Sequence, residues 1–367
     1  KTDGVLHLKG SGGNSSSNIS LNSSGIWSMY GTMKGSSVQI EGQGGSSSNL
    51  DALAQTVGQT NPDLQLNTNR IIQVSRGVYL QGTNVAAAAG STNHDGAISI
   101  HGVAKEGNAN LNGIELYEAK LDAETDLTLV GKGGTANVDV DIVSGIKLVR
   151  AELDAGNTIN LTGEGGQGYG TSNYLQSTSG IDDFGSIISQ TGEQGSVKIK
   201  GTGGSSEGEL KDSHGVRIAA TTVNSQGAVE IEGYGGQGLK VENASGVSLA
   251  LDTGILTTED LKIKGVGGES TTSAFSSTGI NVEKTDLSAL SIEMDGSGGK
   301  AEKSNPNSGN ILGILLRESN ISTTPESNNT GNIVLKGNGG VGFQVLGGVD
   351  ILNSSIKTDK DIVIEGK

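Results

Sequence analysis

A Gly-x-Gly-Gly motif recurs along the whole chain, and a short run of alternating polar and apolar residues precedes each copy. The first glycines of the copies are Gly10, Gly42, Gly131, Gly163, Gly201, Gly233, Gly265, Gly296 and Gly337. A degenerate copy begins at Gly102, and the sequence ends inside another at Gly366. Seven of the ten steps between copies are 29–32 residues long. A fixed period of this length is typical of repeat architectures, in which stacked units bury one continuous core.

A second motif, Gly-[Ile/Val]-x-aliphatic, lies inside each period, for example at Gly145 and Gly246. In seven of ten copies it precedes the next repeat glycine by 17–19 residues. This block of nearly constant length reads as three short strands, which in residues 246–265 are GVSLAL, GILTT and DLKIKG. Period-2 alternation places one set of side chains on a single face: Val247, Leu249, Ile255, Leu261 and Ile263.

Three short strands joined by tight corners make one triangular coil. The sequence therefore predicts an all-β parallel β-helix, or β-solenoid, of about ten coils that spans about 50 Å. The motif glycines are predicted at the corners, where the backbone needs either a positive φ or a close approach to another backbone. The Ser-, Asn- and Gly-rich stretches after each Gly-Gly are predicted to be loops.

The repeats indicate one β-helix domain over residues 1–367. A long insertion at residues 46–76 interrupts it, and Asn49 is placed to cap a short helix over residues 50–57. Both ends of the sequence read as the third strand of a coil. We therefore expect a segment of a longer array, or a unit that stacks end to end on copies of itself.

Composition excludes several classes of protein. The formal charge of −15 argues against nucleic acid and anionic membranes as partners. The absence of cysteine excludes disulfide scaffolds and Cys-ligated metal sites. No apolar run is long enough to span a membrane, and no signal-peptide pattern opens the sequence.

One pair of acidic residues is a weak candidate for a cation site. Asp122 and Asp154 occupy equivalent positions 32 residues apart, so they should lie about 5 Å from each other on adjacent coils. Such a pair could hold a cation or act as in a glycosidase, but the stack does not continue, and a solvated face is the simpler interpretation. Asp183 is likewise interpreted as exposed charge, and His214 as a surface turn residue. We expect no catalytic residue and no cofactor.

Aromatic residues are few, at 3% of the chain. Trp27 and Tyr79 each follow a Gly-Ile or Gly-Val pair in the same register. They should therefore stack on neighbouring coils, either as cross-strand packing or as a face for a ligand.

The repeat GIxL…xLxLxGxGG, followed by a Ser/Asn/Gly loop, resembles the haemagglutinin-type repeats of filamentous-haemagglutinin-like exoproteins of two-partner secretion. The resemblance covers nearly all 367 residues. It implies a right-handed β-helix, export to the bacterial surface, and a role in adhesion or surface filaments, with a receptor, a glycan or neighbouring copies as partners. No catalytic residue is carried over by the resemblance.

Two other functions stay open from the sequence. A β-helical polysaccharide-degrading enzyme is suggested by fold analogy alone. A non-catalytic glycan- or cation-binding module would use the insertion at 46–76 or the Trp27/Tyr79 face.

Overall fold

A computed structural model describes residues 4–13, 21–46, 73–89, 95–107, 109–136, 140–169, 174–301, 310–324, 331–341 and 346–367. The helix expected over residues 50–57, and most of the insertion at 46–76, lie outside these described residues. The described chain consists of strands and connections, and no helix in it is long and apolar enough to cross a membrane.

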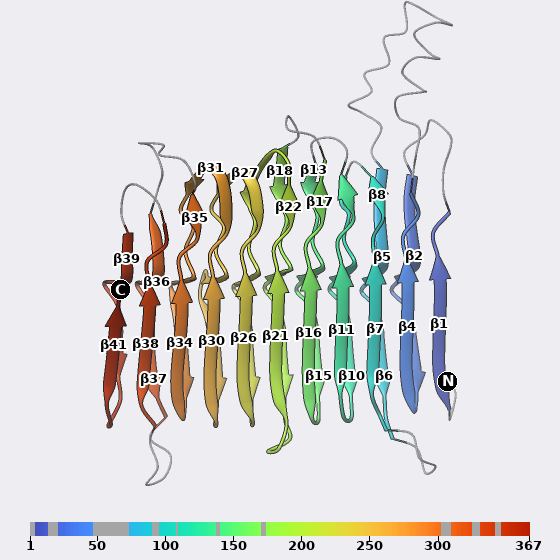
Figure 1. Ribbon diagram of the computed structural model, residues 1–367. Helices are drawn as coiled ribbons and strands as arrows, with labels where there is room; N and C mark the ends of the chain where they lie inside the picture. The colour runs from blue at the N-terminus through green and yellow to red at the C-terminus, as the bar shows by residue number, and fades with distance from the viewer. Residues whose placement is uncertain are drawn as a thin grey trace, which may run out of the picture.

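The chain forms a parallel β-solenoid, as the repeats predict, with about nine turns where the sequence predicts about ten coils (Figure 1). The third strands of the coils form an 11-stranded sheet, here called the front sheet. In order, its strands are β1 (Val5–Ser11), β4 (Ser37–Gln43), β7 (Ile98–Val103), β11 (Leu127–Lys132), β16 (Thr158–Glu164), β21 (Ser196–Thr202), β26 (Ala228–Tyr234), β30 (Asp260–Val266), β34 (Ser291–Ser297), β38 (Ile333–Asn338) and β41 (Ile362–Gly366).

The first strands of the coils form a ten-stranded sheet, here called the roof sheet. Its strands are β2 (Leu21–Met29), β5 (Gln73–Gln81), β9 (Ile114–Tyr117), β14 (Ile146–Val149), β19 (Ile181–Phe184), β24 (Val216–Ala219), β28 (Val247–Ala250), β32 (Ile280–Glu283), β36 (Ile311–Arg317) and β39 (Leu346–Leu352).

The second strands form another ten-stranded sheet, the back sheet, which closes the triangle. Its strands are β3 (Thr32–Gly35), β6 (Asn84–Ala87), β10 (Lys120–Ala123), β15 (Glu152–Ala155), β20 (Ile187–Gln190), β25 (Thr222–Ser225), β29 (Thr253–Thr257), β33 (Thr285–Ala289), β37 (Asn320–Thr323) and β40 (Ser355–Lys357).

The main core fills this triangle, because alternate residues of each strand point inward. All five residues that the alternation predicts on one face are fully or almost fully buried: Val247, Leu249, Ile255, Leu261 and Ile263. Equivalent residues of adjacent coils are direct partners, as Leu129 is of Leu161. One period of the sequence is therefore one turn of the solenoid.

The repeat glycines work by close approach. They form one column in the front sheet, in which Gly163 pairs with Gly131 and Gly201. A Cβ added at Gly163 would overlap the carbonyl oxygen of Gly180, the glycine of the second motif. The front and roof sheets therefore touch through two facing rows of glycine, here called the glycine seam.

Positive φ is used at a different corner, between the roof and back sheets. There the residue is most often not glycine, as at Glu118 (φ 51°), Arg150 (52°) and Lys284 (49°). Of the two reasons predicted for the motif glycines, close approach of two backbones therefore holds, and a positive φ does not.

Beyond the glycine seam the stretches predicted to be loops form a fourth sheet, which corrects that expectation. This lobe sheet has ten strands, all paired in parallel. They are β8 (Glu106–Gly107), β12 (Thr135–Ala136), β13 (Val140–Ile142), β17 (Gln167–Gly168), β18 (Tyr174–Ser177), β22 (Ser205–Ser206), β23 (Glu209–Asp212), β27 (Gln237–Glu242), β31 (Glu269–Phe275) and β35 (Lys300–Ala301).

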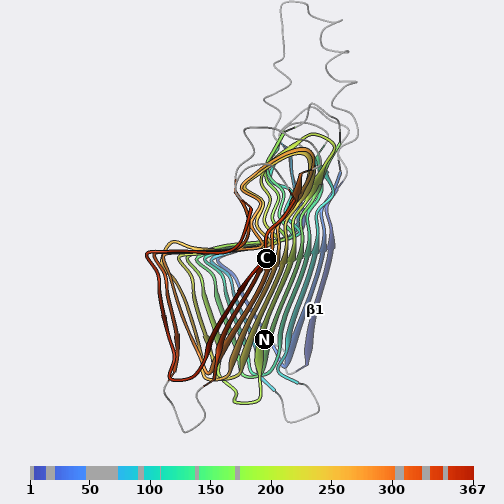
Figure 2. The same ribbon diagram turned by 60° about the vertical axis from the view of Figure 1, so that its left-hand side comes forward.

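The lobe has a core of its own, separate from the main core. Its members include Leu111, Val143, Leu175, Leu210 and Val241, all buried. Figure 2 shows the roof sheet running across the top of the triangle and meeting the lobe at an inner corner. The cross-section is therefore two-lobed, with the glycine seam at its waist.

Candidate ligand-binding faces

The clearest candidate for a ligand face lies on the outer side of the roof sheet. Trp27 and Tyr79 are direct partners on β2 and β5, which confirms their predicted register. Their ring centroids are 6.4 Å apart and their planes meet at 65°, an edge-to-face contact. Trp27 is 55% exposed, so this contact leaves a large part of the indole open to solvent.

Polar groups fix the neighbouring rings. The Arg76 guanidinium lies 4.5 Å from the Tyr79 ring centroid, and its Nε is 2.5 Å from Glu115 Oε2. The Tyr79 hydroxyl donates to Gln81 Oε1 over 2.9 Å, and Gln81 Nε2 donates to the Tyr30 hydroxyl over 3.4 Å. Burial, more than any other cause, raises the pKa of Tyr79, so its hydroxyl stays a neutral donor at neutral pH.

One further aromatic ring extends this face. Tyr117 is the direct partner of Gln81 on the next turn, and the Arg150 guanidinium lies 5.2 Å from its ring centroid. Together Trp27, Tyr30, Tyr79 and Tyr117, four of the ten aromatic residues, form what we call the aromatic platform. A rigid, partly exposed set of rings beside amide and guanidinium groups suits a ligand with both apolar and hydroxylated faces.

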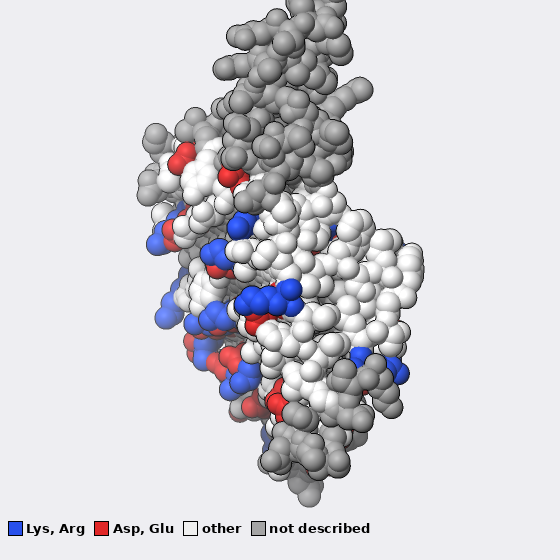
Figure 3. Space-filling view, turned by 90° about the vertical axis from the view of Figure 1, so that its right-hand side faces the viewer, with Lys and Arg blue, Asp and Glu red and all other residues white. Residues whose placement is uncertain are grey.

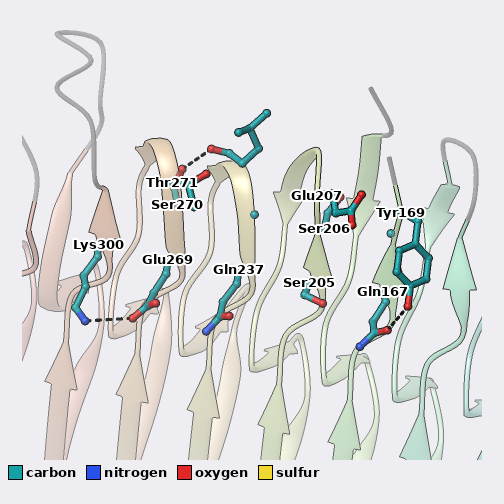
Figure 4. Close-up of a pocket in the computed structure, with 13 residues that line it drawn as sticks. Gln167, Tyr169, Ser205, Ser206, Glu207, Gln237, Glu269, Ser270, Thr271 and Lys300 are labelled. Atoms are coloured by element: carbon teal, nitrogen blue, oxygen red, sulfur yellow. Dashed lines mark hydrogen bonds and ion pairs between the residues drawn. The ribbon is translucent and has the colours of Figure 1, made fainter. Parts of the chain in front are cut away.

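A second hollow, here called the lobe groove, runs along the outside of the lobe, and the sequence pattern does not predict it. It has a volume of about 620 Å³. Figure 4 shows a row of polar side chains, one from each successive turn, projecting beside it. The row is Gln167, Ser205, Gln237, Glu269 and Lys300, each the direct partner of the next.

Some of these polar groups are already bonded within the groove. The Tyr169 hydroxyl donates to Gln167 Oε1 over 3.3 Å, and Lys300 Nζ lies 3.4 Å from Glu269 Oε1. The groove is open and polar, and it lacks a buried group aimed at a ligand among the described residues. It is therefore a weaker candidate than the aromatic platform.

The predicted aspartate pair is present in register. Asp122 and Asp154 are direct partners on β10 and β15, followed by Ser189. Lys120 Nζ lies 3.4 Å from Asp154 Oδ2 and 2.9 Å from Glu152 Oε2, so an internal cation already faces Asp154. Within the described ranges no three His, Asp or Glu side chains gather as a metal-binding group.

Two residues expected at the surface are buried instead. Asp183 is 1% exposed because its place in β19 faces the main core, between Leu148 and Ile218 on the adjacent turns. His214 is 3% exposed because it lies at the inner corner between roof and lobe. The burial of His214 depends on the lobe, which the sequence predicts as loops, whereas the burial of Asp183 follows from its register in the main triangle.

On the outer face of the front sheet, positively and negatively charged side chains are interspersed. Lys200 Nζ lies 2.8 Å from Glu232 Oε2, and Lys132 Nζ lies 2.8 Å from Glu164 Oε1, each pair joining adjacent turns. Figure 3 shows Lys and Arg alternating with Asp and Glu down one side of the molecule, seen along its axis. Such exposed pairs contribute little stability each, and their alternation leaves this side without a single sign of charge.

Comparison of the chain with family models, curated proteins and solved structures finds no match. The fold is that of a parallel β-solenoid, and the resemblance to haemagglutinin-type repeats remains an interpretation of the sequence pattern.

Proposed function

We propose that this chain is a non-catalytic adhesive rod whose aromatic platform binds neutral glycans. The edge-to-face Trp27–Tyr79 pair on the outer face of the roof sheet is the observation that carries the proposal. Aromatic side chains present large contact area at little cost in conformational entropy, and they dominate the energetics of many interfaces.

The proposed setting is the surface of a bacterium, as part of a secreted adhesin or filament of the filamentous-haemagglutinin type. The repeat pattern supports that setting, and the regular stacking supports a structural role. A long, stiff solenoid holds a binding face away from the surface that carries it.

The single tryptophan of the chain makes this function directly measurable. Because Trp27 lies within the platform, a bound glycan should change its fluorescence in a saturable way. We suggest titrating the purified protein with cellohexaose, xylohexaose and mannohexaose. We expect Tyr30→Ala to weaken the binding of the preferred glycan at least tenfold, which corresponds to about 1.4 kcal/mol.

The matched control is Tyr169→Ala, which removes another exposed tyrosine, one that lines the lobe groove. We expect this variant to bind the same glycan as tightly as the unaltered protein. Unchanged Trp27 emission with all three glycans, or equal losses in the two variants, would contradict binding at the platform.

A further inference from the structure

A pocket of about 590 Å³ is lined by residues of the inner corner where the roof sheet meets the lobe. Figure 2 shows the course of the chain at that corner. The roof contributes Asp182, His214 and Arg217, and the lobe contributes Asp212. Its remaining lining residues are Ile142, Ser177 and Asn243. We call this cavity the corner pocket.

His214 is buried in the wall of the corner pocket with one ring nitrogen engaged. Its Nδ1 accepts the backbone N–H of Ser245 over 3.2 Å, so the neutral ring carries its proton on Nε2. Burial and, to a lesser extent, the Arg217 charge lower the pKa of His214 to about 4, which keeps the ring neutral at neutral pH. Among the described residues, Nε2–H has no hydrogen-bond partner.

The chain itself shows how such a donor is satisfied elsewhere. Three turns earlier Asn112 occupies the equivalent position, and its Oδ1 accepts the N–H of Ser144 over 3.0 Å. Its Nδ2 donates to Glu115 Oε2 over 3.0 Å, and that carboxylate also pairs with Arg76. At Asn112, the acceptor for the side-chain N–H is therefore the carboxylate of Glu115, three residues further along the chain.

At His214 the residue three positions further on is Arg217, which is itself a donor. Arg217 donates from a terminal guanidinium nitrogen to Asp182 Oδ1 over 2.9 Å on the preceding turn. The corner pocket is therefore lined by the N–H of a buried imidazole ring, without the carboxylate that completes the equivalent site at Asn112. A ligand oxygen would supply the missing acceptor.

The charge of the pocket distinguishes among oxygen ligands. Asp182, Asp212 and Arg217 give a net charge of −1, which disfavours a carboxylate or phosphate. Asp212 Oδ1 accepts from Asn243 Nδ2 over 2.7 Å, so Oδ2 can accept from a ligand. A hydroxyl group can accept from one partner and donate to another, which matches this mixture of donors and acceptors.

We propose that the corner pocket binds the adjacent hydroxyl groups of a neutral sugar unit, one accepting from His214 Nε2–H and one donating to Asp212. This site is separate from the aromatic platform and does not depend on the function proposed for it. A sugar bound there would supply an acceptor to an N–H group that has none among the described residues.

The test uses the side-chain NMR signals of the four histidines of the chain. The probes are the methyl glycosides of glucose, galactose and mannose, each added to roughly 0.1 M, where even a millimolar site is filled. We expect at least one probe to shift the His214 ring signals in a saturable way, while those of His7 and His101 stay in place.

The variant His214→Ser places at this position the residue of the two adjacent turns, Ser179 and Ser245, so the fold should be retained. Saturation-transfer signals of the binding glycoside should disappear in this variant and persist in His101→Ser, which alters an exposed histidine. Shifts with none of the three probes, or shifts with methyl glucuronide alone, would overturn the proposal. Trp27 emission reports the platform separately, so failure at one site is not failure at the other.

Discussion

Replacing Gly233 by alanine is expected to destabilise the solenoid by about 3 kcal/mol. The added Cβ would overlap the Gly246 carbonyl oxygen and lie 2.6 Å from the Gly246 carbonyl carbon and 2.8 Å from Val247 Cγ2. Two of these three neighbours are backbone atoms of Gly246 in the facing row of the glycine seam, so they cannot rotate away. The front and roof sheets would have to separate at the glycine seam, which opens both cores.

Gly254→Ala is the matched control for this substitution. Gly254 lies in β29 of the back sheet, and a Cβ there would meet no atom within 4 Å. We expect its stability to be equal to that of the unaltered protein or greater by less than about 1 kcal/mol. Urea unfolding followed by circular dichroism measures both variants. Equal midpoints for Gly233→Ala and Gly254→Ala would show that the seam is not a site of close contact.

Replacing Asp183 by leucine is expected to stabilise the protein by up to about 4 kcal/mol at pH 8. Neither carboxyl oxygen of Asp183 forms a hydrogen bond, and its direct partners on the adjacent turns are Leu148 and Ile218. Burial raises the pKa of Asp183 from 3.8 to about 7, although the nearby Ser186 and Thr221 hydroxyls lower it somewhat. This rise from 3.8 to about 7 corresponds to a cost of about 4 kcal/mol for ionising the buried carboxyl.

The sign of the pH dependence follows from this raised pKa. Below about pH 3.8 the carboxyl is protonated in both the folded and the unfolded chain, so it carries no ionisation cost. Between about pH 3.8 and 7 the unfolded chain releases the proton and the folded chain keeps it, so stability falls as pH rises. Above about pH 7 the loss is complete and stays constant.

Unfolding free energies measured from pH 3 to pH 8 test this expectation. The difference between Asp183→Leu and the unaltered protein should grow with pH across that window. Asp295→Asn, which removes an exposed carboxylate from the front sheet, should leave the pH profile unchanged. A gain for Asp183→Leu that is the same at both ends of the range would mean that Asp183 is not held protonated in the folded protein.

The sequence predicts the main triangle well because its signal is repeated. Each coil supplies the same alternation of polar and apolar residues at a nearly constant distance from a glycine, so chance matches are averaged out. The pairing of Trp27 with Tyr79 and that of Asp122 with Asp154 follow from the same register.

The lobe could not be predicted in the same way. Its strands are as short as two residues, as in β12 (Thr-Ala) and β17 (Gln-Gly), which is too short to show an alternation of polar and apolar residues. The apolar positions, such as Leu175 and Leu210, occur about once per turn at a variable distance from the Gly-Gly pair. A strand of that length is stable only because it pairs with the strands of the adjacent turns.

The burial of Asp183 and His214 was not predicted, for two other reasons. Asp183 lies where the alternation predicts an inward side chain, but carboxylates are rarely buried without a partner, so its register and its polarity give opposite predictions. His214 is buried by the lobe, so its environment depends on a part of the fold that the local pattern does not reveal.

Both proposed binding faces require that one period of about 32 residues is one physical turn, because their residues come together only in that register. The absence of cysteine allows a clean test by disulfide formation. Lys200 and Glu232 are direct partners on β21 and β26, so cysteines introduced at both positions should form a disulfide readily. Cysteines at Lys200 and Lys264, two turns apart, should not form one. Equal cross-linking of the two pairs, or cross-linking of the second alone, would contradict the fold and the faces built on it.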